Sequence, residues 1–204
     1  MSLYEYRVLF LTVTGILTLL VASPALSRLL VPPRTEFFTE LWILDSNHRA
    51  DDYPFNVTRN QDYSVFLGIG NRLGYCAYYF VEVKFRNQTQ PAPTSFGPPA
   101  NRTPSSLPAL FNATAFVADE TVWETPLTFS FDYGYSEALS RVEFYNLTLN
   151  NVEVDMSDYT ITWDSEKGGF FGYLFFELWI FDATTSSSRY HERFVDLRFN
   201  MTVY

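Results

Sequence analysis

After residue 35 the sequence alternates repeatedly between apolar and polar side chains, and this period of two constrains the fold more than any other feature. Successive side chains of a β-strand point to opposite faces, so such alternation is typical of strands with one buried and one wet face. Two half-apolar sheets must bury each other, which predicts an all-β fold, an antiparallel immunoglobulin-like β-sandwich over residues 35–204. The apolar stripes are Tyr63, Val65, Leu67 and Ile69; Tyr79, Val81, Val83 and Phe85; Leu127, Phe129, Phe131 and Tyr133; and Val195, Leu197, Phe199, Met201 and Val203.

Aromatic content and local turn signals support the β assignment. The chain has 20 Phe and 14 Tyr, and both residue types favour strands. Residues 140–154 alternate less cleanly, so we expect a bulge or a turn near Asn150-Asn151, and Gly168-Gly169 indicates a hairpin turn. Segments 40–45 (ELWILD) and 177–182 (ELWIFD) resemble each other. We interpret them as two strands with similar core roles, neighbours in one sheet.

The N-terminal part of the chain contains an uncharged apolar segment, Val8 to Leu26, of 19 residues. A helix needs about 20 apolar residues to cross a bilayer. Its threonines can bond back to carbonyls one turn earlier, and Gly15 would allow another helix to approach closely. We therefore predict a transmembrane anchor with a short linker over residues 1–34, with membrane lipid as its first partner.

A cleaved signal peptide is the alternative for this segment. Its apolar stretch would need about 7–15 residues, and Val8 to Ala22 would fit. Two features favour a retained anchor. Only Arg7 and the amino terminus are positive before the segment, against Glu5, and Pro24 disrupts the best cleavage site. Whether the helix is retained or cleaved stays open from the sequence.

Six of the 11 asparagines lie in Asn-x-Thr sequons, all of them after the apolar segment. Use of these sites would place the domain outside the cell, with N-linked glycans attached. Charge alone leaves the orientation ambiguous, because Arg28 and Arg34 follow the segment and only Arg7 precedes it. The alternative is that Asn and Thr are simply common in β-rich chains. The predicted glycosylation sites are Asn56, Asn87, Asn101, Asn112, Asn146 and Asn200, of which Asn101 is weakened by the following Pro104 and Asn200 falls on the polar side of its strand.

Residues 87–111 differ in character from the strands around them. This stretch holds six of the chain's 11 prolines, and proline cannot donate to a β-ladder. Long loops in compact domains tend to be functional or mobile. We predict an exposed, glycosylated loop, with a partner-binding loop as the sharper alternative.

Charge and residue types exclude several classes of function. The part after Arg34 carries 11 basic and 22 acidic residues, a net charge of −11, which disfavours nucleic acid as a partner. The single cysteine, Cys76, cannot form an intrachain disulfide and is expected to be a small buried hydrophobe. Both His48 and His191 are expected at the surface. We therefore expect no metal site and no cofactor.

Other chemical motifs are weak. Residues 45–52 (DSNHRADD) offer oxygen ligands but lack the glycine and distal glutamate of a calcium loop, so a solvated turn is the better interpretation. Gly68 and Gly70 lack the rest of a dinucleotide fingerprint. A pair of carboxylates in a cleft stays open, but no spacing points to one. We expect no catalytic residues and no enzymatic activity.

Short motifs along the outer domain resemble a known family. They are residues 38–45 (FTELWILD), 50–54 (ADDYP), 56–58 (NVT), 67–71 (LGIGN), 120–124 (ETVWE) and 173–179 (YLFFELW). Together they resemble the outer domain of an archaeal membrane-protein family, domain of unknown function 1616, over most of residues 8–182. The resemblance implies an outer domain after a transmembrane helix and an archaeal cell-surface location, where such sequons are used. Family members often have several such helices, whereas this chain has one. The family has no established activity, so the resemblance implies no mechanism.

Three functional hypotheses follow. The first is a membrane-anchored, N-glycosylated extracellular structural or interaction protein of the cell envelope with protein partners, either a stand-alone surface glycoprotein or an accessory subunit of a larger membrane complex. The second is a secreted filament subunit, in which residues 29–44 (LLVPPRTEFFTELWIL) of a cleaved chain pair into a neighbour's sheet. The third is a ligand-binding module or an enzyme that uses carboxylates on sugars.

Overall fold

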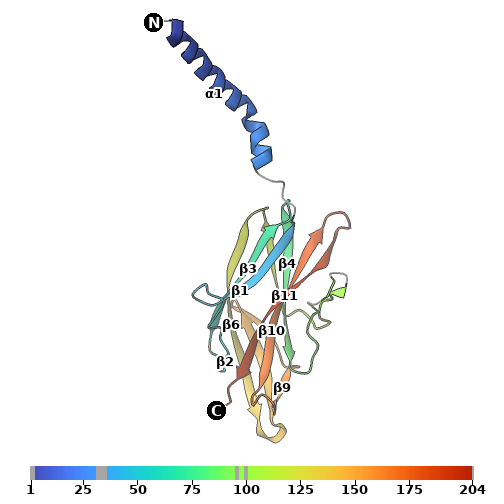
Figure 1. The fold of residues 1–204 in the computed structure, drawn as a ribbon. Coiled ribbons are helices and arrows are strands. Elements are labelled where there is room, and N and C mark those ends of the chain that lie inside the picture. The colour runs from blue at the N-terminus through green and yellow to red at the C-terminus, as the bar shows by residue number, and fades with distance from the viewer. Residues whose placement is uncertain (1–2, 31–35, 95–96, 99–100, 204) are drawn as a thin grey trace. The chain divides into compact units, whose positions relative to one another are not determined.

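The computed structural model describes residues 3–30, 36–94, 97–98 and 101–203. It divides the chain into two compact units, Met1–Phe37 and Phe38–Tyr204. The first unit contains helix α1 (Leu3–Leu30), which includes the predicted membrane segment (Figure 1). Most of the predicted linker, and the side chain of Leu26, lie outside the described residues.

Helix α1 is long and apolar enough to cross a membrane over Tyr6–Pro24, and none of that stretch is buried. A signal sequence near the N-terminus has the same properties. The predicted back-bonding is confirmed: the hydroxyls of Thr12, Thr14 and Thr18 donate to carbonyls four residues earlier at 2.8–2.9 Å. These bonds satisfy the polar groups within the helix, as a lipid environment requires.

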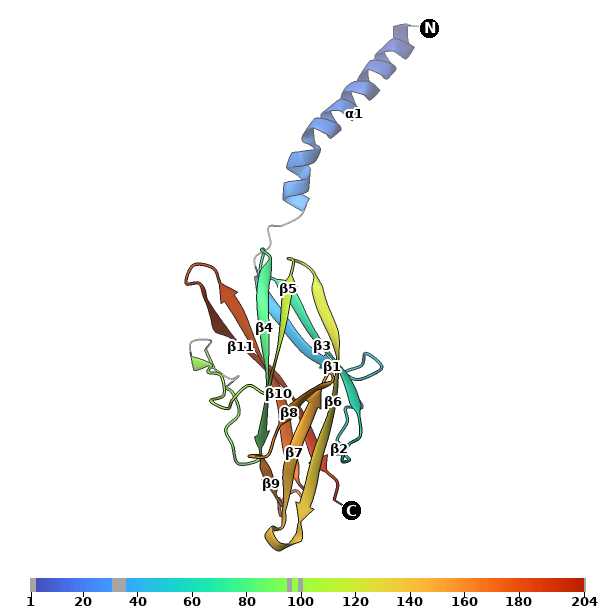
Figure 2. The ribbon, with the colours of Figure 1, turned by 180° about the vertical axis from the view of Figure 1, so that it is seen from behind.

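The second unit consists of two β-sheets (Figure 1, Figure 2). We call them the β6 sheet and the β10 sheet after their long central strands. In the β6 sheet the order is β1 (Phe38–Leu44), β3 (Tyr63–Arg72), β6 (Val122–Ser136), β7 (Arg141–Leu149) and β8 (Val152–Asp155), with β9 (Thr160–Thr162) paired to β7. In the β10 sheet the order is β2 (Asn56–Val57), β11 (Ser187–Met201), β10 (Phe171–Asp182), β4 (Ala77–Asn87) and β5 (Phe111–Val117).

The predicted all-β fold is confirmed, with one correction to the strand directions. The short β2 pairs with β11 in parallel, with Asn56 opposite Asn200. The other pairs are antiparallel. After β1 the chain passes through a turn to β2. This short strand forms the edge of the β10 sheet, beside the last strand, β11. The finer expectation of an immunoglobulin-like arrangement stays a prediction.

The core lies between the two sheets and is built from the predicted apolar stripes. Phe85 of the β10 sheet meets Phe144 and Phe131 of the β6 sheet, with ring centroids 5.0 and 5.9 Å apart. Phe131 also lies 5.5 Å from Phe199. Burial of one such side chain contributes about 1.5–3 kcal/mol, so these stripes dominate the stability of the domain. Of the residues in the four stripes, all are buried except Tyr63, Val195 and Val203, which are half-buried.

The predicted turns are also present. Asn150 and Asn151 join β7 to β8 with φ values of 46° and 65°, which suits a two-residue hairpin turn. A register shift between Asp132 and Tyr133 is the bulge in the β6–β7 pair. Between β9 and β10, Gly168 has φ of 67° and donates its N–H to the Asp164 carbonyl at 2.8 Å. A short 3₁₀ turn (Glu137–Leu139) joins β6 to β7.

The two similar segments do not neighbour each other in one sheet, so that part of the prediction is wrong. Residues 40–45 belong to β1 and the residue after it, in the β6 sheet, whereas residues 177–182 belong to β10. The structure also explains Gly68 and Gly70. Trp42 lies opposite Gly68 on β3, and its ring occupies the space that a Cβ atom there would take. These glycines therefore make room for side chains of β1.

Candidate functional site

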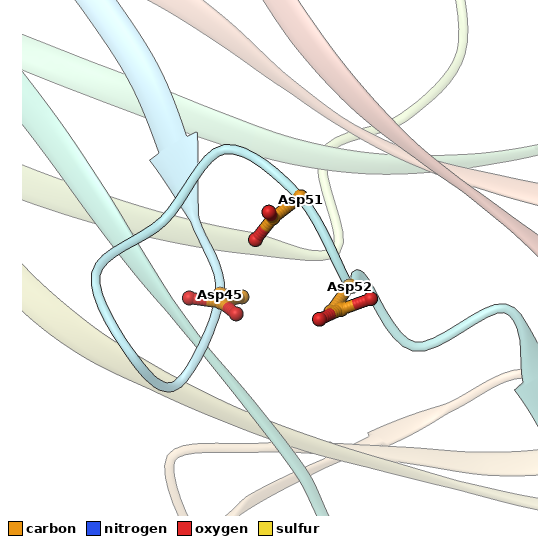
Figure 3. A group of neighbouring side chains, drawn as sticks. All are labelled: Asp45, Asp51 and Asp52. Atoms are coloured by element: carbon orange, nitrogen blue, oxygen red, sulfur yellow. The ribbon is translucent and has the colours of Figure 1, made fainter.

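Three aspartates gather in the turn after β1 (Figure 3). One carboxylate oxygen each from Asp45, Asp51 and Asp52 lies within 4.8 Å of the others, so the group could hold a cation. However, the buried Asp45 already accepts hydrogen bonds from the N–H groups of Asn47 at 2.9 Å and Arg49 at 2.7 Å. These two bonds, with that from Arg49 the larger cause, hold the pKa of Asp45 below its ordinary value despite burial. Arg49 also pairs with Asp51 at 2.9 Å. Groups of the turn itself therefore already engage two of the three carboxylates, and Asp45 is buried, unlike the solvated turn that the sequence predicts.

The second cluster is a buried ion pair on the outer face of the β10 sheet. Lys84 of β4 and Glu177 of β10 are 4% and 0% exposed, with their Nζ and Oε2 atoms 2.8 Å apart. Lys84 Nζ also contacts the Ser105 carbonyl at 3.0 Å and Glu82 Oε2 at 3.1 Å. Lys84 therefore donates two hydrogen bonds, to Glu177 and Ser105, and forms a second ion pair with Glu82. Burial raises the pKa of the Glu177 carboxyl, and the hydrogen bonds from Lys84 and Ser105 oppose that rise.

Ser105 ties the proline-rich loop to this ion pair. Its N–H donates to Glu177 Oε1 at 2.6 Å while its carbonyl accepts from Lys84. Ser105 and Pro93 are both buried, so the expectation of an exposed loop is wrong at these positions. The physical reason is that a buried ion pair is stable only when further hydrogen bonds satisfy its remaining donors and acceptors. The backbone of Ser105 provides two of these hydrogen bonds. We call Lys84, Glu177 and Ser105 the loop clamp.

Two aromatic residues lie beside the loop clamp. Trp179 of β10 and Tyr190 of β11 meet edge to face, with ring centroids 5.7 Å apart. Burial and the nearby Glu177 carboxyl raise the pKa of the Tyr190 hydroxyl to about 12. The clamp residues and these aromatics were missed by the sequence analysis. A signal was present, because residues 173–179 (YLFFELW) carry apolar side chains on both faces of the strand.

The histidines and the cysteine differ in part from expectation. His48 is exposed as predicted, with its ring against Phe66 at 3.8 Å. His191 is half-buried instead, and its Nε2 lies 2.7 Å from Thr39 Oγ1 of β1. Burial, together with Arg189 and Arg193, lowers the pKa of His191 to about 4. Cys76 is exposed in the segment before β4, so the prediction of a buried hydrophobe is wrong.

The six predicted glycosylation sites fall into two groups of three. Asn56, Asn101 and Asn112 have exposed side chains. Asn87, Asn146 and Asn200 are half-buried, and the Nδ2 atom of each already donates to Thr160, Glu153 and Asn56 respectively. An N-linked glycan is attached to Nδ2 and extends into water. The three exposed asparagines are therefore the better sites for glycan attachment. Occupancy of all six sites stays a prediction.

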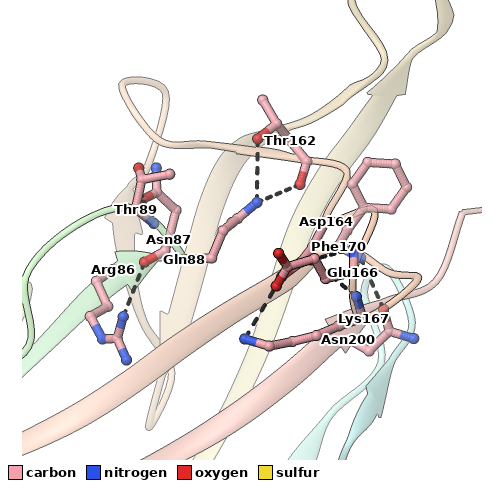
Figure 4. Close-up of polar contacts among 10 residues, drawn as sticks. All are labelled: Arg86, Asn87, Gln88, Thr89, Thr162, Asp164, Glu166, Lys167, Phe170 and Asn200. Carbon is pink, nitrogen blue, oxygen red and sulfur yellow. Dashed lines mark hydrogen bonds and ion pairs between the residues drawn. The ribbon is translucent and has the colours of Figure 1, made fainter.

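Two of the half-buried sites hold loops in place (Figure 4). Asn87 Oδ1 accepts from the N–H groups of Thr89 and Gln90 at 3.0 and 3.1 Å, and Gln88 reaches the Thr162 carbonyl at 2.7 Å. Asn200 Oδ1 accepts from the Phe170 N–H at 3.1 Å, although Asn200 lies on the polar side of its strand as predicted. These carboxamides have structural roles, which sets them apart from the freely exposed sites.

A known protein family matches part of the chain. The family described as "Domain of unknown function (DUF1616)" matches residues 32–145, more than half of the chain. The matched part includes the acidic turn, Lys84 and Ser105 of the loop clamp, and four of the six sequons. No curated protein matches the chain.

Proposed function

The chain belongs to the DUF1616 family, and from this membership we propose that it is a membrane-anchored glycoprotein of the cell envelope whose β domain lies outside the cell. A DUF1616 domain after an N-terminal apolar helix fits a membrane-anchored protein. The observation that carries the proposal is the unburied apolar stretch Tyr6–Pro24, followed by a domain that holds all six sequons. An archaeal source belongs to the same proposal.

In this proposal the β domain is a structural or interaction module and not an enzyme. Lys84 and Glu177 form an acid–base pair, but both side chains are buried, and the buried Ser105 of the loop binds Glu177. A substrate would need the loop to open before it reached either group. In the acidic turn, N–H groups engage the carboxylate of Asp45 and the Arg49 side chain engages that of Asp51. Both clusters are accounted for by their contacts within the domain, which supports a role without catalysis.

The proposed protein partner is a larger membrane complex, which the chain would join as an accessory subunit. Helix α1 is apolar and unburied, and no neighbouring atom lies within 4 Å of the space that a Cβ atom on Gly15 would fill. Small residues let helices approach closely in lipid. Purification of the native protein in mild detergent should therefore bring down a defined set of partners. Isolation of the chain alone at native abundance would count against the subunit role.

The filament alternative has less support. It needs residues 29–44 to leave their own domain and pair with a neighbour. In the structure, residues 38–44 already form β1, paired with β3 over seven residues and with Ile43 buried. A mature N-terminus near residue 25 together with a high-mass polymer would restore this alternative.

The intact mass of the native protein tests anchor and glycans together. We expect a mass that includes residues 1–25 and the glycans on the exposed sites. Asn112→Gln should remove the mass of one glycan, while the half-buried Asn146→Gln should change it by only the substitution. An unmodified mass in a soluble cytoplasmic fraction would contradict the proposed location. Equal glycan loss from both variants would contradict the ranking of sites by exposure.

A further inference from the structure

Five large apolar side chains are exposed at one end of the β domain, and we call them the aromatic rim. Phe116 is 70% and Tyr75 is 55% exposed. The strand register places the members at the same end of the domain, because the start of β1 pairs with the end of β3 and the start of β4 pairs with the end of β5. The β10–β11 turn lies at this same end of the domain (Figure 1, Figure 2). The rim consists of Phe38, Tyr75, Phe116, Val122 and Phe181.

Part of the rim surrounds a hollow. Tyr75, Tyr78, Phe116 and Phe181 line a depression of about 420 Å³ at the tips of β4, β5 and β10. Asp182 and Arg189 also line it. The rings of Tyr78 and Phe116 lie beside the hollow with centroids 6.4 Å apart. Exposed apolar side chains that lie around a hollow mark interaction surfaces more often than singly scattered ones do.

The rim lies at the end of the domain to which α1 is covalently attached. Only residues 31–37 join Leu30 to Phe38, and a segment of this length spans at most about 30 Å when fully extended. The opposite end of the domain is farther away than this, because a strand of 15 residues such as β11 is about 50 Å long. This short covalent connection limits how far the rim can move from a bilayer that contains α1, which gives the rim a high effective concentration there.

We propose that the aromatic rim docks onto the lipid headgroup region of the bilayer that α1 enters, so that the domain stands on the membrane by this end. This inference rests on the membrane anchoring proposed above. Aromatic rings are favoured at membrane–water interfaces, where their apolar body meets lipid and their edge meets water. Partial burial of the rim in the interface would remove its exposed apolar area from water.

Electrostatic attraction is not the basis of this docking. The part of the chain after Arg34 has a net charge of −11, which disfavours anionic lipids. Near the rim, Arg72 lies opposite Phe38, and both Arg189 and Asp182 line the hollow, so neither sign of charge dominates the hollow. The docking should therefore occur on neutral phosphatidylcholine and should change little with salt.

The exposed Cys76 provides the test, because it lies beside Tyr75 and is the only cysteine of the chain. The full chain is labelled at Cys76 with a polarity-sensitive fluorophore and reconstituted into phosphatidylcholine vesicles. Lipids with a nitroxide near the headgroup end of the acyl chain then serve as quenchers. The matched control is Cys76→Ser with Ser165→Cys, which puts the same label on an exposed turn at the opposite end of the domain. We expect at least twofold stronger quenching at Cys76 than at position 165.

A double variant separates docking from simple proximity. Phe116→Ser with Phe181→Ser removes two exposed rings and should bring quenching at Cys76 close to the control value. The matched variant Leu139→Ser, at the opposite end, should leave it unchanged. Circular dichroism and thermal unfolding show whether each variant is folded. Proximity imposed by the linker alone would leave the quenching of the double variant unchanged and would overturn the proposal.

Vesicle flotation separates this inference from the proposed function. A chain that floats with the vesicles, but whose label at Cys76 is quenched no more than the label at position 165, overturns the rim docking alone. A chain that does not float overturns the anchoring and the docking with it. A blue-shifted label that lipid quenchers do not reach, and that shifts back on dilution, would show that a second copy covers the rim, and this too would overturn the lipid proposal.

Discussion

The outer faces of the two sheets differ, although both sheets share one core. On β6 the outward residues Glu124, Thr128 and Asp132 are polar and wholly or partly exposed, which is the ordinary wet face of a sandwich. On β10 the outward residues Phe175 and Glu177 are completely buried. The middle of β10 is therefore buried on both sides, and part of the proline-rich loop acts as a third layer over it. The difference shows that a loop without regular secondary structure can complete the domain.

The two faces also use charge differently. On the β6 sheet, Arg59 pairs with Asp132 at 2.7 Å, but both side chains reach water. On the β10 sheet, Lys84 and Glu177 pair at a similar distance with almost no exposure. A surface pair contributes little to stability, whereas loss of one partner from a buried pair leaves an uncompensated charge. Burial, and not distance, decides the value of each contact.

The largest effect is expected when the loop clamp loses its cation. Lys84→Met leaves the buried Glu177 carboxylate with only the Ser105 N–H as a partner. We expect a loss of about 3–5 kcal/mol in the free energy of unfolding, measured by denaturant titration. Glu82→Gln, at a partly exposed partner of the same lysine, is the control and should cost far less. If Lys84→Met cost no more than that control, the clamp would not stabilise the domain.

Replacement of both charges sharpens the same point. In Lys84→Met with Glu177→Leu, no uncompensated charge remains, so the loss should be smaller than the sum of the two single losses. The difference measures how strongly the two groups depend on each other. Strict additivity would indicate that the pair acts as two independent packing residues.

The next effect is pH dependence from His191, at the seam where β11 meets β1. Its pKa is about 4 in the folded protein and about 6.5 when unfolded, so the unfolded state takes up a proton first as pH falls. The free energy of unfolding should therefore decrease between pH 6.5 and pH 4, by on the order of 2–3 kcal/mol from this group. His191→Gln should remove that part of the pH dependence, while His48→Gln, in the exposed turn, should retain it. Parallel stability curves for wild type and His191→Gln would contradict the assignment.

A smaller effect is expected from the loop backbone. Ser105→Pro removes the N–H that donates to Glu177, and a buried acceptor that loses its donor costs about 1–3 kcal/mol. The loop should also become easier to cleave with trypsin at Arg102. Ser106→Pro, at an exposed neighbour, is the matched control. Equal protease resistance in both variants would mean that the clamp does not hold the loop.

The wet face was predictable from the sequence and the covered face was not. The stripe from Leu127 to Tyr133 alternates cleanly with polar residues, and its apolar members are all buried. On β10 the same rule fails, because apolar side chains occupy both faces and no local pattern says what covers the second one. The partners of Glu177 lie 72 and 93 residues away, so no sequence window could join them.

The glycosylation sites show the same limit. A sequon marks Asn56 and Asn200 equally, yet their strands pair and Asn200 donates to Asn56 at 3.0 Å. The exposure of Cys76 was missed for a related reason. Its apolar neighbours from Tyr75 to Val81 indicate a buried strand, but the strand begins only at Ala77. Local patterns identify strands well and identify their ends and partners poorly.

The smallest expected effect lies on the wet face itself. Arg59→Met breaks the pair with Asp132 and removes a cation that lies 5.6 Å from the Tyr145 ring centroid. Because both partners of the pair are solvated, the free energy of unfolding should fall by at most about 1 kcal/mol, and raised salt should reduce the difference further. The loss of stability caused by Lys84→Met should depend little on salt, because dissolved ions do not reach the buried pair of Lys84 and Glu177. If Arg59→Met and Lys84→Met cost the same and respond alike to salt, the two faces are equally wet in solution, and the loop does not act as a third layer.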